Sequence, residues 1–424
     1  MRRVRALLLV VAVGVVSVLG AVAEGADSRA AGDIQWTRQF GLEGFDSGEA
    51  VAVHSTGVYV TGKVRGALPG QTHYGDDDVF VRRYDHAGKH RWTRQFGGTA
   101  ERNDVGCGIA VNDLGVYVVG KRVMKNDLGH VRGDQLFLRK YNHAGKHQWT
   151  KQFGISPSEV LCGVAVDASG VYVTGNVEGA YPGHTHYGLQ DVLVRKYGHN
   201  GAHHWTRQFG TYSWEHGSAV AVNDSGVYVT GAVNGALPGQ THRGGGDIFV
   251  RKYSPAGKAL WTRQFGTGFS DEGRGVAVDA SGVYVIGRVE DALPGQTHQG
   301  GRDVFVRKYD HAGKHQWTRQ FGTGGWDVGQ AVAVNSSGVY VAGHAGGALP
   351  GQTHQGLADV FVRHYSRDGG HRWTRQFGAW HHDDGLGVAA NNVAVYVTGY
   401  VSGALPHQTH GGAIDVFLRK YSTK

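Results

Sequence analysis

The chain has 424 residues, including 70 glycines, 8 prolines and 2 cysteines, and its formal charge is +8. Its 10 Trp, 19 Tyr and 15 Phe exclude a disordered chain, because such chains are poor in aromatic residues. Two cysteines are too few for a disulfide-stapled scaffold. The basic residues recur evenly along the sequence, which excludes a concentrated nucleic-acid footprint.

The first 23 residues have the features of a secretory signal. Three arginines within the first five residues precede an apolar run over 6–20, and small residues follow at 21–23. The run is too short for a transmembrane helix, and no later stretch is long enough to span a membrane. We therefore expect cleavage after Ala23, a short linker over 24–32, and an exported protein that is secreted, periplasmic or held at the cell surface.

From residue 33 to the end, the sequence repeats seven times, and its tryptophan motif recurs every 56 or 57 residues. The motif Trp-Thr-(Arg/Lys)-Gln-Phe-Gly begins at Trp36, Trp92, Trp149, Trp205, Trp261, Trp317 and Trp373. A second motif, typified by Gly-Val-Tyr-Val-Thr-Gly, has its tyrosine at Tyr59, Tyr117, Tyr172, Tyr228, Tyr284, Tyr340 and Tyr396. A third motif, typified by Asp-Val-Phe-Val-Arg-Arg-Tyr, ends at Tyr84, Tyr141, Tyr197, Tyr253, Tyr309, Tyr365 and Tyr421.

Each repeat predicts four short antiparallel strands, which we name a to d. In the first repeat they are 51–53, 58–62, 79–84 and 92–96, all rich in β-branched and aromatic residues. Tight turns that contain glycine join strand a to b and strand c to d. Seven four-stranded units predict an all-β fold, a seven-bladed β-propeller.

The two ends of the repeat region predict a closed ring. A stacked β-solenoid would need special end caps. Here the repeat region begins with a lone strand d over 35–40 and ends with a lone strand c over 416–421. We expect these two segments to pair, which completes the seventh blade and removes open sheet edges.

The three motifs together resemble the bacterial seven-bladed β-propeller (SBBP) repeat family over about residues 33–422. The resemblance implies the propeller fold and an exported bacterial protein, and it supplies no catalytic residues. Two segments depart from the pattern. Residues 123–129 replace the usual Gly-Ala-Leu-Pro-Gly-Gln-Thr loop, and the turn at 391–394 lacks its glycine.

Three sets of polar residues recur on the d–a and b–c loops, which alternating strand directions place on one face. An acid precedes strand a at Asp46, Asp104, Glu159, Glu215, Asp271, Asp327 and Asp383. A histidine lies five residues before strand c at His73, His130, His186, His242, His298, His354 and His410. Strand c begins with an acid at Asp78, Asp191, Asp247, Asp303, Asp359 and Asp415, and with Gln135 in the remaining repeat.

Aromatic residues stand ahead of several of the strand-a acids, at Phe45, Trp214, Phe269, Trp326 and Trp380. Aromatic rings beside carboxylates and imidazoles are typical of sugar sites, because rings stack on C–H faces and acids accept hydroxyl hydrogen bonds. We therefore take the strand-a acids, the loop histidines and Trp214, Trp326 and Trp380 as candidate ligand-binding residues. The alternative is structural: the acids bond turn amides or tie blades together, and the histidines bond loop carbonyls.

The sequence indicates no metal site, no cofactor and no catalytic residue. The histidines and acids lack the tight spacing of a zinc site. Paired carboxylates could hydrolyse a glycoside, but no blade is singled out as an active site. Cys107 and Cys162 occupy equivalent places before strand a, where parallel side-chain directions disfavour a disulfide. Mid-strand arginines such as Arg82 are expected to pair with acids between blades.

Three functions remain open. The leading hypothesis is a monomeric, secreted, non-catalytic recognition scaffold that binds glycan or another surface polymer at several sites. The second is an extracellular polysaccharide hydrolase or lyase working at the channel mouth. The third is a structural component of the cell envelope. No nucleic-acid partner is expected, because no basic patch is concentrated in the sequence.

Overall fold

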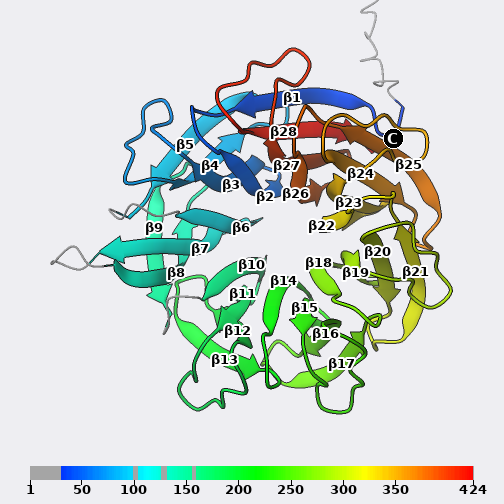
Figure 1. Ribbon diagram of the computed structural model, residues 1–424. Helices are drawn as coiled ribbons and strands as arrows, with labels where there is room; N and C mark the ends of the chain where they lie inside the picture. Colours follow the sequence, from blue (N-terminus) through cyan, green and yellow to red (C-terminus); the bar gives the residue numbers. More distant parts are fainter. Residues whose placement is uncertain (1–29, 99–103, 126–130, 155–158, 424) are drawn as a thin grey trace, which may run out of the picture.

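All 28 strands that the repeats predict are present, because the Val, Tyr and Phe side chains of each repeat pack on both faces of a four-stranded sheet. The computed structural model describes residues 30–98, 104–125, 131–154 and 159–423. These residues form seven antiparallel sheets arranged as blades around a central channel (Figure 1). The predicted signal and most of the predicted linker lie outside the described residues.

Each blade has four strands in the order a to d from the channel outward (Figure 1). The innermost strands of blades 1 to 7 are β2 (Ser47–His54), β6 (Val105–Asn112), β10 (Val160–Asp167), β14 (His216–Asn223), β18 (Glu272–Asp279), β22 (Val328–Asn335) and β26 (Asp384–Ala390). The second strands are β3 (Gly57–Val64), β7 (Gly115–Lys125), β11 (Gly170–Val177), β15 (Gly226–Val233), β19 (Gly282–Val289), β23 (Gly338–Ala345) and β27 (Ala394–Val401).

The outer half of each blade is built in the same way. The third strands are β4 (Asp78–Tyr84), β8 (Val131–Tyr141), β12 (Asp191–Tyr197), β16 (Asp247–Tyr253), β20 (Asp303–Tyr309), β24 (Asp359–Tyr365) and β28 (Asp415–Ser422). The outermost strands are β5 (His90–Phe96), β9 (His147–Phe153), β13 (His203–Phe209), β17 (Ala259–Phe265), β21 (His315–Phe321), β25 (His371–Phe377) and, in blade 7, β1 (Ile34–Phe40).

The innermost strands are longer than the sequence predicts, since β2 covers 47–54 rather than 51–53. The pairing of β2 with β3 is irregular between Gly48 and Ala50, within the residues by which β2 exceeds the prediction. The same kind of register shift occurs in the other six innermost strands. Such a bulge interrupts the two-residue alternation of side chains along a strand, and the predicted strand covered only the Val-Ala-Val motif that follows it.

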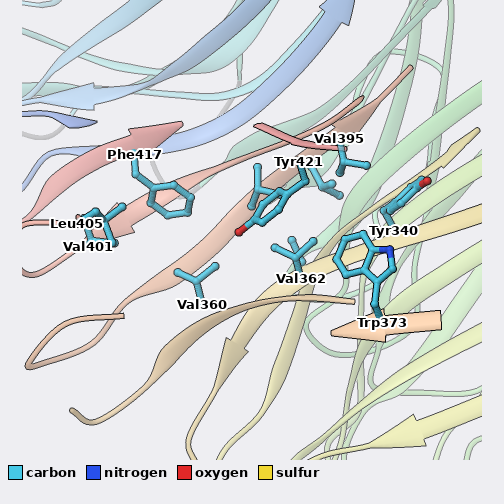
Figure 2. Close-up of a cluster of buried hydrophobic side chains, with 12 residues drawn as sticks. Tyr340, Val360, Val362, Trp373, Val395, Val401, Leu405, Phe417 and Tyr421 are labelled. Atoms are coloured by element: carbon cyan, nitrogen blue, oxygen red, sulfur yellow. The ribbon is translucent and has the colours of Figure 1, made fainter. Parts of the chain in front are cut away.

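The hydrophobic core lies between neighbouring blades. Figure 2 shows the cluster between blades 6 and 7, where Val360 and Val362 of β24 face Phe417 and Tyr421 of β28. These four side chains are completely buried. Equivalent clusters fill the other blade junctions. Burial on both faces of each sheet explains why its central strands carry consecutive apolar residues such as Val58, Tyr59 and Val60.

The repeated tryptophan holds each blade to the next one. Trp36 donates its indole N–H to the carbonyl of His86 (3.2 Å), in the turn between β4 and β5, and Arg38 donates to the carbonyl of Gly88 (2.8 Å). Gly88 has a φ of +80°, and its Cα lies against the Trp36 ring. An added Cβ would be 2.9 Å from Cδ2 of that ring. We call this contact the blade latch.

The mid-strand arginines also lie between blades, although the prediction of acidic partners was wrong where their contacts are described. Arg82 donates to the Thr93 hydroxyl (3.0 Å), and its guanidinium lies 3.8 Å from the centre of the Phe40 ring of the neighbouring blade. The same donation to a strand-d threonine is made by Arg251, Arg307 and Arg419. Stacking on an aromatic face therefore takes the place of an ion pair.

Ring closure follows the sequence prediction. β1 pairs antiparallel with β28, so the two ends of the described chain share blade 7 (Figure 1). No turn joins these two strands, and Gly32 replaces the usual turn glycine on the ring of Trp373. The Trp373 indole N–H has no partner among the described residues. The latch at this junction therefore keeps the glycine contact and the hydrogen bond from Arg375 to the Gly32 carbonyl (3.0 Å), but it lacks the indole hydrogen bond.

Removing β1 tests the closure. We expect deletion of residues 33–41 to lower Tm by more than ~10 °C, because β28 would lose its neighbour and blade 1 would lose the packing of Trp36 and Phe40 against it. Thermal unfolding measures the effect. Ile34→Thr, at an exposed residue of the same strand, is the control and should change Tm by less than ~2 °C. An unchanged Tm in the deletion variant would contradict closure through β1.

The blade latch predicts different costs for two glycines with similar backbone angles. Gly88 and Gly70 have φ of +80° and +73°, but an added Cβ at Gly70 meets nothing within 4 Å. Gly70→Ala should therefore cost about 1 kcal/mol for backbone strain alone. Gly88→Ala should cost ~1–3 kcal/mol more, because the methyl group displaces the Trp36 ring. Urea unfolding of both variants compares the two costs, and equal costs would rule out the latch.

Candidate functional site at the channel mouth

The acids before the innermost strands are buried loop anchors. Asp271 is 1% exposed, and it accepts hydrogen bonds from the Thr267 N–H and hydroxyl and from the Glu290 N–H (3.0 Å). It therefore ties the d–a loop to the b–c loop of the same blade. Equivalent backbone bonds are made by Asp46, Glu215, Asp327 and Asp383. Asp104 accepts from the Gly98 N–H, and Glu159 is also fully buried.

The loop histidines lie beside the acids that begin strand c. His298 Nδ1 is 3.4 Å from Asp303, which also accepts a hydrogen bond from Gln320 of strand d (2.8 Å). His354 and His410 have the same relation to Asp359 and Asp415. His73 instead donates to the carbonyl of Asp76 (2.9 Å), His186 and His242 are half-buried in equivalent loops, and His130 lies outside the described residues.

These contacts agree with the structural alternative for the acids, which order the loops of the channel-mouth face. Among the histidines, His73 bonds a loop carbonyl as that alternative expects, whereas His298, His354 and His410 lie beside acids. A ligand role for these residues stays a prediction, since a direct contact would have to compete with the hydrogen bonds just described.

The buried acids give the protein a pH dependence that one substitution can isolate. Burial raises the pKa of Asp271 to about 6, above the usual value of 3.8. A raised pKa means that the contribution of this group to stability is greatest when it is protonated and is lost as pH rises through 6. Between pH 7.5 and pH 5, wild type should therefore gain about 1 kcal/mol more unfolding free energy than Asp271→Asn.

Urea unfolding at the two pH values measures this difference. Several histidines have a lowered pKa because of burial and destabilise the fold as pH falls, but they titrate alike in both proteins and cancel in the comparison. An equal pH response of the two proteins would contradict the raised pKa of Asp271.

The seven blades differ in the side chain at which each innermost strand bulges. This residue lines a channel cavity of about 210 Å³ in every blade. Its identity changes around the ring, from Glu49, Cys107, Cys162, Ser218 and Arg274 to Gln330 and Leu386. Of this set, the sequence singles out only Cys107 and Cys162, because the site prediction relied mainly on residues that recur and the residue at this position does not.

Polar side chains from four blades interlock at one side of the channel mouth. We call His216, Glu272, Arg274, Gln330, Asp384 and His344 the polar arc. Glu272 contacts His216 (3.0 Å) and Arg274 (2.8 Å), and Arg274 donates to the Gln330 amide oxygen (3.1 Å). Gln330 then donates to Asp384 (2.8 Å), which also lies 2.9 Å from His344 Nδ1. The arc breaks the sevenfold symmetry of the fold.

The carboxyl groups of the channel have opposite electrostatic environments. Burial acts to raise the pKa of Glu272, but the hydrogen bond with His216 and the charges of Arg274 and Arg288 outweigh it and lower the pKa to about 2. Across the channel, burial raises the pKa of Glu49 despite a hydrogen bond from Ser47. Glu272 is therefore a permanent anion within the arc.

A cavity of about 460 Å³ opens beside the arc between blades 3 and 6, and we call it the mouth cavity. Its polar lining consists of Asn176, Gln190, His216, Ser218, Glu272, Arg274 and Gln330. Asn176 donates to the Gln190 amide oxygen (2.8 Å). The backbone of Gln190 pairs with that of Trp214, which places this tryptophan next to a residue of the cavity wall.

The aromatic residues predicted on this face are exposed. The exposed fractions are 50% for Trp214, 63% for Trp326 and 84% for Trp380, and Phe45 and Phe269 are also more than half exposed. Each lies in the loop that leads into an innermost strand. The Arg302 guanidinium stacks over the Trp326 ring at 4.5 Å, which fixes the ring without covering it completely.

Cys107 and Cys162 face the channel from neighbouring blades as free thiols. The hydrogen bond with Cys162 and burial raise the pKa of the Cys107 thiol well above its usual value. Within the described residues, no group of three or more His, Cys, Asp or Glu side chains is arranged to hold a metal ion. That part of the chain likewise contains no helix with the length and apolar character to cross a bilayer.

The fold and this face define the chain as a seven-bladed β-propeller with an asymmetric channel mouth. No family model matches it. The WD40 β-propeller domain of Doa1 aligns with a TM-score of 0.51 and 11% identity over 93% of this chain and 97% of that chain, a likeness of fold alone. The regulatory protein FlaEY of Caulobacter vibrioides is 29% identical over 202 residues. The match covers 42% of this chain and 21% of that protein, so the chain spans about a fifth of its length.

Proposed function

We propose that this protein is an exported, non-catalytic recognition scaffold that binds carbohydrate polymers through its channel-mouth face. The observation that carries the proposal is the exposure of Trp214, Trp326 and Trp380 on that face. None of them belongs to the blade latch, which uses the other seven tryptophans. Large exposed rings beside polar groups suit sugars, whose C–H faces stack on rings while their hydroxyls form hydrogen bonds.

Repetition around the ring supports a polymeric ligand. The exposed aromatic residues come from the loops that enter blades 1, 4, 5, 6 and 7, and all of these loops open on the same face. A single shallow sugar site binds weakly. Several sites engaged by one polymer gain an avidity of ~10²–10⁴ without any new contact.

Membership of the SBBP repeat family and export through the predicted signal belong to this proposal. Both rest on the sequence motifs and on the leader at residues 1–23. An exported scaffold would meet polysaccharides of the cell surface or its surroundings. The FlaEY relative bears the description of a regulatory protein, which is compatible with a binding role.

A polysaccharide-acting enzyme is the second candidate, and one observation favours it. Two carboxyl groups that face the channel differ in their pKa values, since the pKa of Glu272 is lowered and that of Glu49 is raised. Carboxyl groups with pKa values pushed apart are a pattern of general acid and base pairs. Release of reducing sugar from a bound polymer, abolished by Glu49→Gln, would replace the scaffold proposal with this one.

The triple variant W214A/W326A/W380A tests the scaffold proposal. Binding to a panel of immobilised neutral, amino and acidic polysaccharides should weaken by at least ~100-fold, because the polymer would lose three stacking sites. Tm should stay within about 2 °C, since the three rings are at least half exposed.

The matched control is L114A/V393A, which removes two exposed apolar side chains from the a–b turns on the opposite face. It should bind like wild type. Equal binding of the triple variant and wild type, or absence of wild-type binding across the whole panel, would rule out carbohydrate recognition in favour of a structural envelope component.

A further inference from the structure

We propose that the mouth cavity is a specificity subsite for one neutral, hydroxyl-rich sugar unit at the end or at a branch of the polymer. This inference rests on the proposed function and adds a site to it. Its starting point is that Ser218, Arg274 and Gln330 line the cavity from a channel position whose identity changes around the ring. The blade latch and the loop anchors repeat, so they cannot distinguish one ligand orientation from another.

The size of the cavity suits a small polar group. Its volume of about 460 Å³ lies within the roughly 300–1,000 Å³ that is usual for small-molecule sites. The mouth cavity shares Ser218, Arg274 and Gln330 with the channel cavity of about 210 Å³ that all seven blades line. A chain end or a branch can enter the mouth cavity, whereas the middle of a polymer would have to pass across the face.

The chemistry of the wall suits hydroxyl groups. Asn176, Gln190 and Gln330 carry amides that both donate and accept, and the Glu272 carboxylate accepts. The arc holds these groups in fixed positions: Gln330 lies between Arg274 and Asp384, and Glu272 contacts His216 and Arg274. A ligand with several hydroxyls would therefore meet preorganised partners, which lowers the cost of ordering them.

Charge selects a neutral ligand. Arg274 and Arg288 are both bound to Glu272, at 2.8 and 3.1 Å, and Arg288 also pairs with Glu290 (3.0 Å). An acidic sugar would have to compete with Glu272 for Arg274. A cationic ligand would face the two guanidinium groups. A neutral sugar makes hydrogen bonds without breaking an ion pair.

Trp214 connects the subsite to the polymer-binding face. Its backbone pairs with that of Gln190 at the cavity wall, and its ring is half exposed. One sugar unit can therefore stack on Trp214 while the next unit occupies the cavity. The equivalent positions of blade 1 have a different chemistry. An ion pair between Lys63 and Asp77 (2.9 Å) stands there in place of the amides of Asn176 and Gln190 in blade 3.

Filling the cavity tests the proposal. Ser218→Trp adds bulk where the serine hydroxyl has no partner among the described residues, so no known hydrogen bond is lost. Leu386→Trp is the matched control, because it adds the same bulk at the equivalent position of blade 7, outside the mouth cavity. Gln190→Ala is a milder second variant that keeps the test valid if S218W fails to fold.

The probe is an array of neutral, amino and acidic oligosaccharides of two to four units, run beside the polysaccharide panel. We expect wild type to bind neutral members, S218W and Q190A to bind them at least 10-fold more weakly, and L386W to bind like wild type. Polymer binding should fall less in S218W than in the triple tryptophan variant, since stacking sites remain.

The two proposals fail in different ways. If wild type and the triple variant differ on polymers while S218W and Q190A bind short oligosaccharides like wild type, the subsite is disproved and the scaffold proposal stands. Polymer binding without any binding of short oligosaccharides disproves the subsite as well. A preference for acidic members overturns the neutral specificity, and absence of all binding overturns both proposals.

Discussion

The structure depends on the contact between the strand-d tryptophan of one blade and the c–d turn of the next blade. Glycine is required at that turn because the indole ring lies against its Cα, and the indole N–H satisfies a turn carbonyl that would otherwise face the ring. Trp36 and Arg38 make this contact together, and five further blade junctions repeat the indole hydrogen bond. Together with the apolar clusters between blades, the latch joins seven separate sheets into one ring.

The same constraint divides the molecule into residues that must repeat and residues that are free to differ. Latch tryptophans, interior strand residues and loop-anchoring acids recur because every junction needs the same packing. Bulged residues such as Ser218 and Arg274 face the channel, where no neighbouring sheet restricts them. Asymmetric chemistry can therefore accumulate at the channel mouth without cost to the scaffold, and this is where the polar arc lies.

Prediction from sequence succeeded where a local pattern determines the structure and failed where partners come from distant repeats. The split blade at 35–40 and 416–421 was correctly predicted to close the ring. Arg82 was expected to pair with an acid, but a threonine of its own blade and a phenylalanine ring of the neighbouring blade are its partners. For the acids before strand a, the sequence leaves open a ligand-binding role and a structural role. The buried contacts of Asp271 agree with the structural role, in which the acid anchors a loop.

The sequence by itself determined the number of blades, the strand order and the face on which the loops gather, because these follow from a repeat spacing and from alternating strand direction. Tertiary structure alone decided which residues meet at the channel. Glu272 and Asp384 are 112 positions apart and belong to different repeats, yet both join the polar arc through Arg274 and Gln330. Their proximity depends on the curvature of the ring and on a bulge in each innermost strand, and neither property is encoded in a short-range pattern.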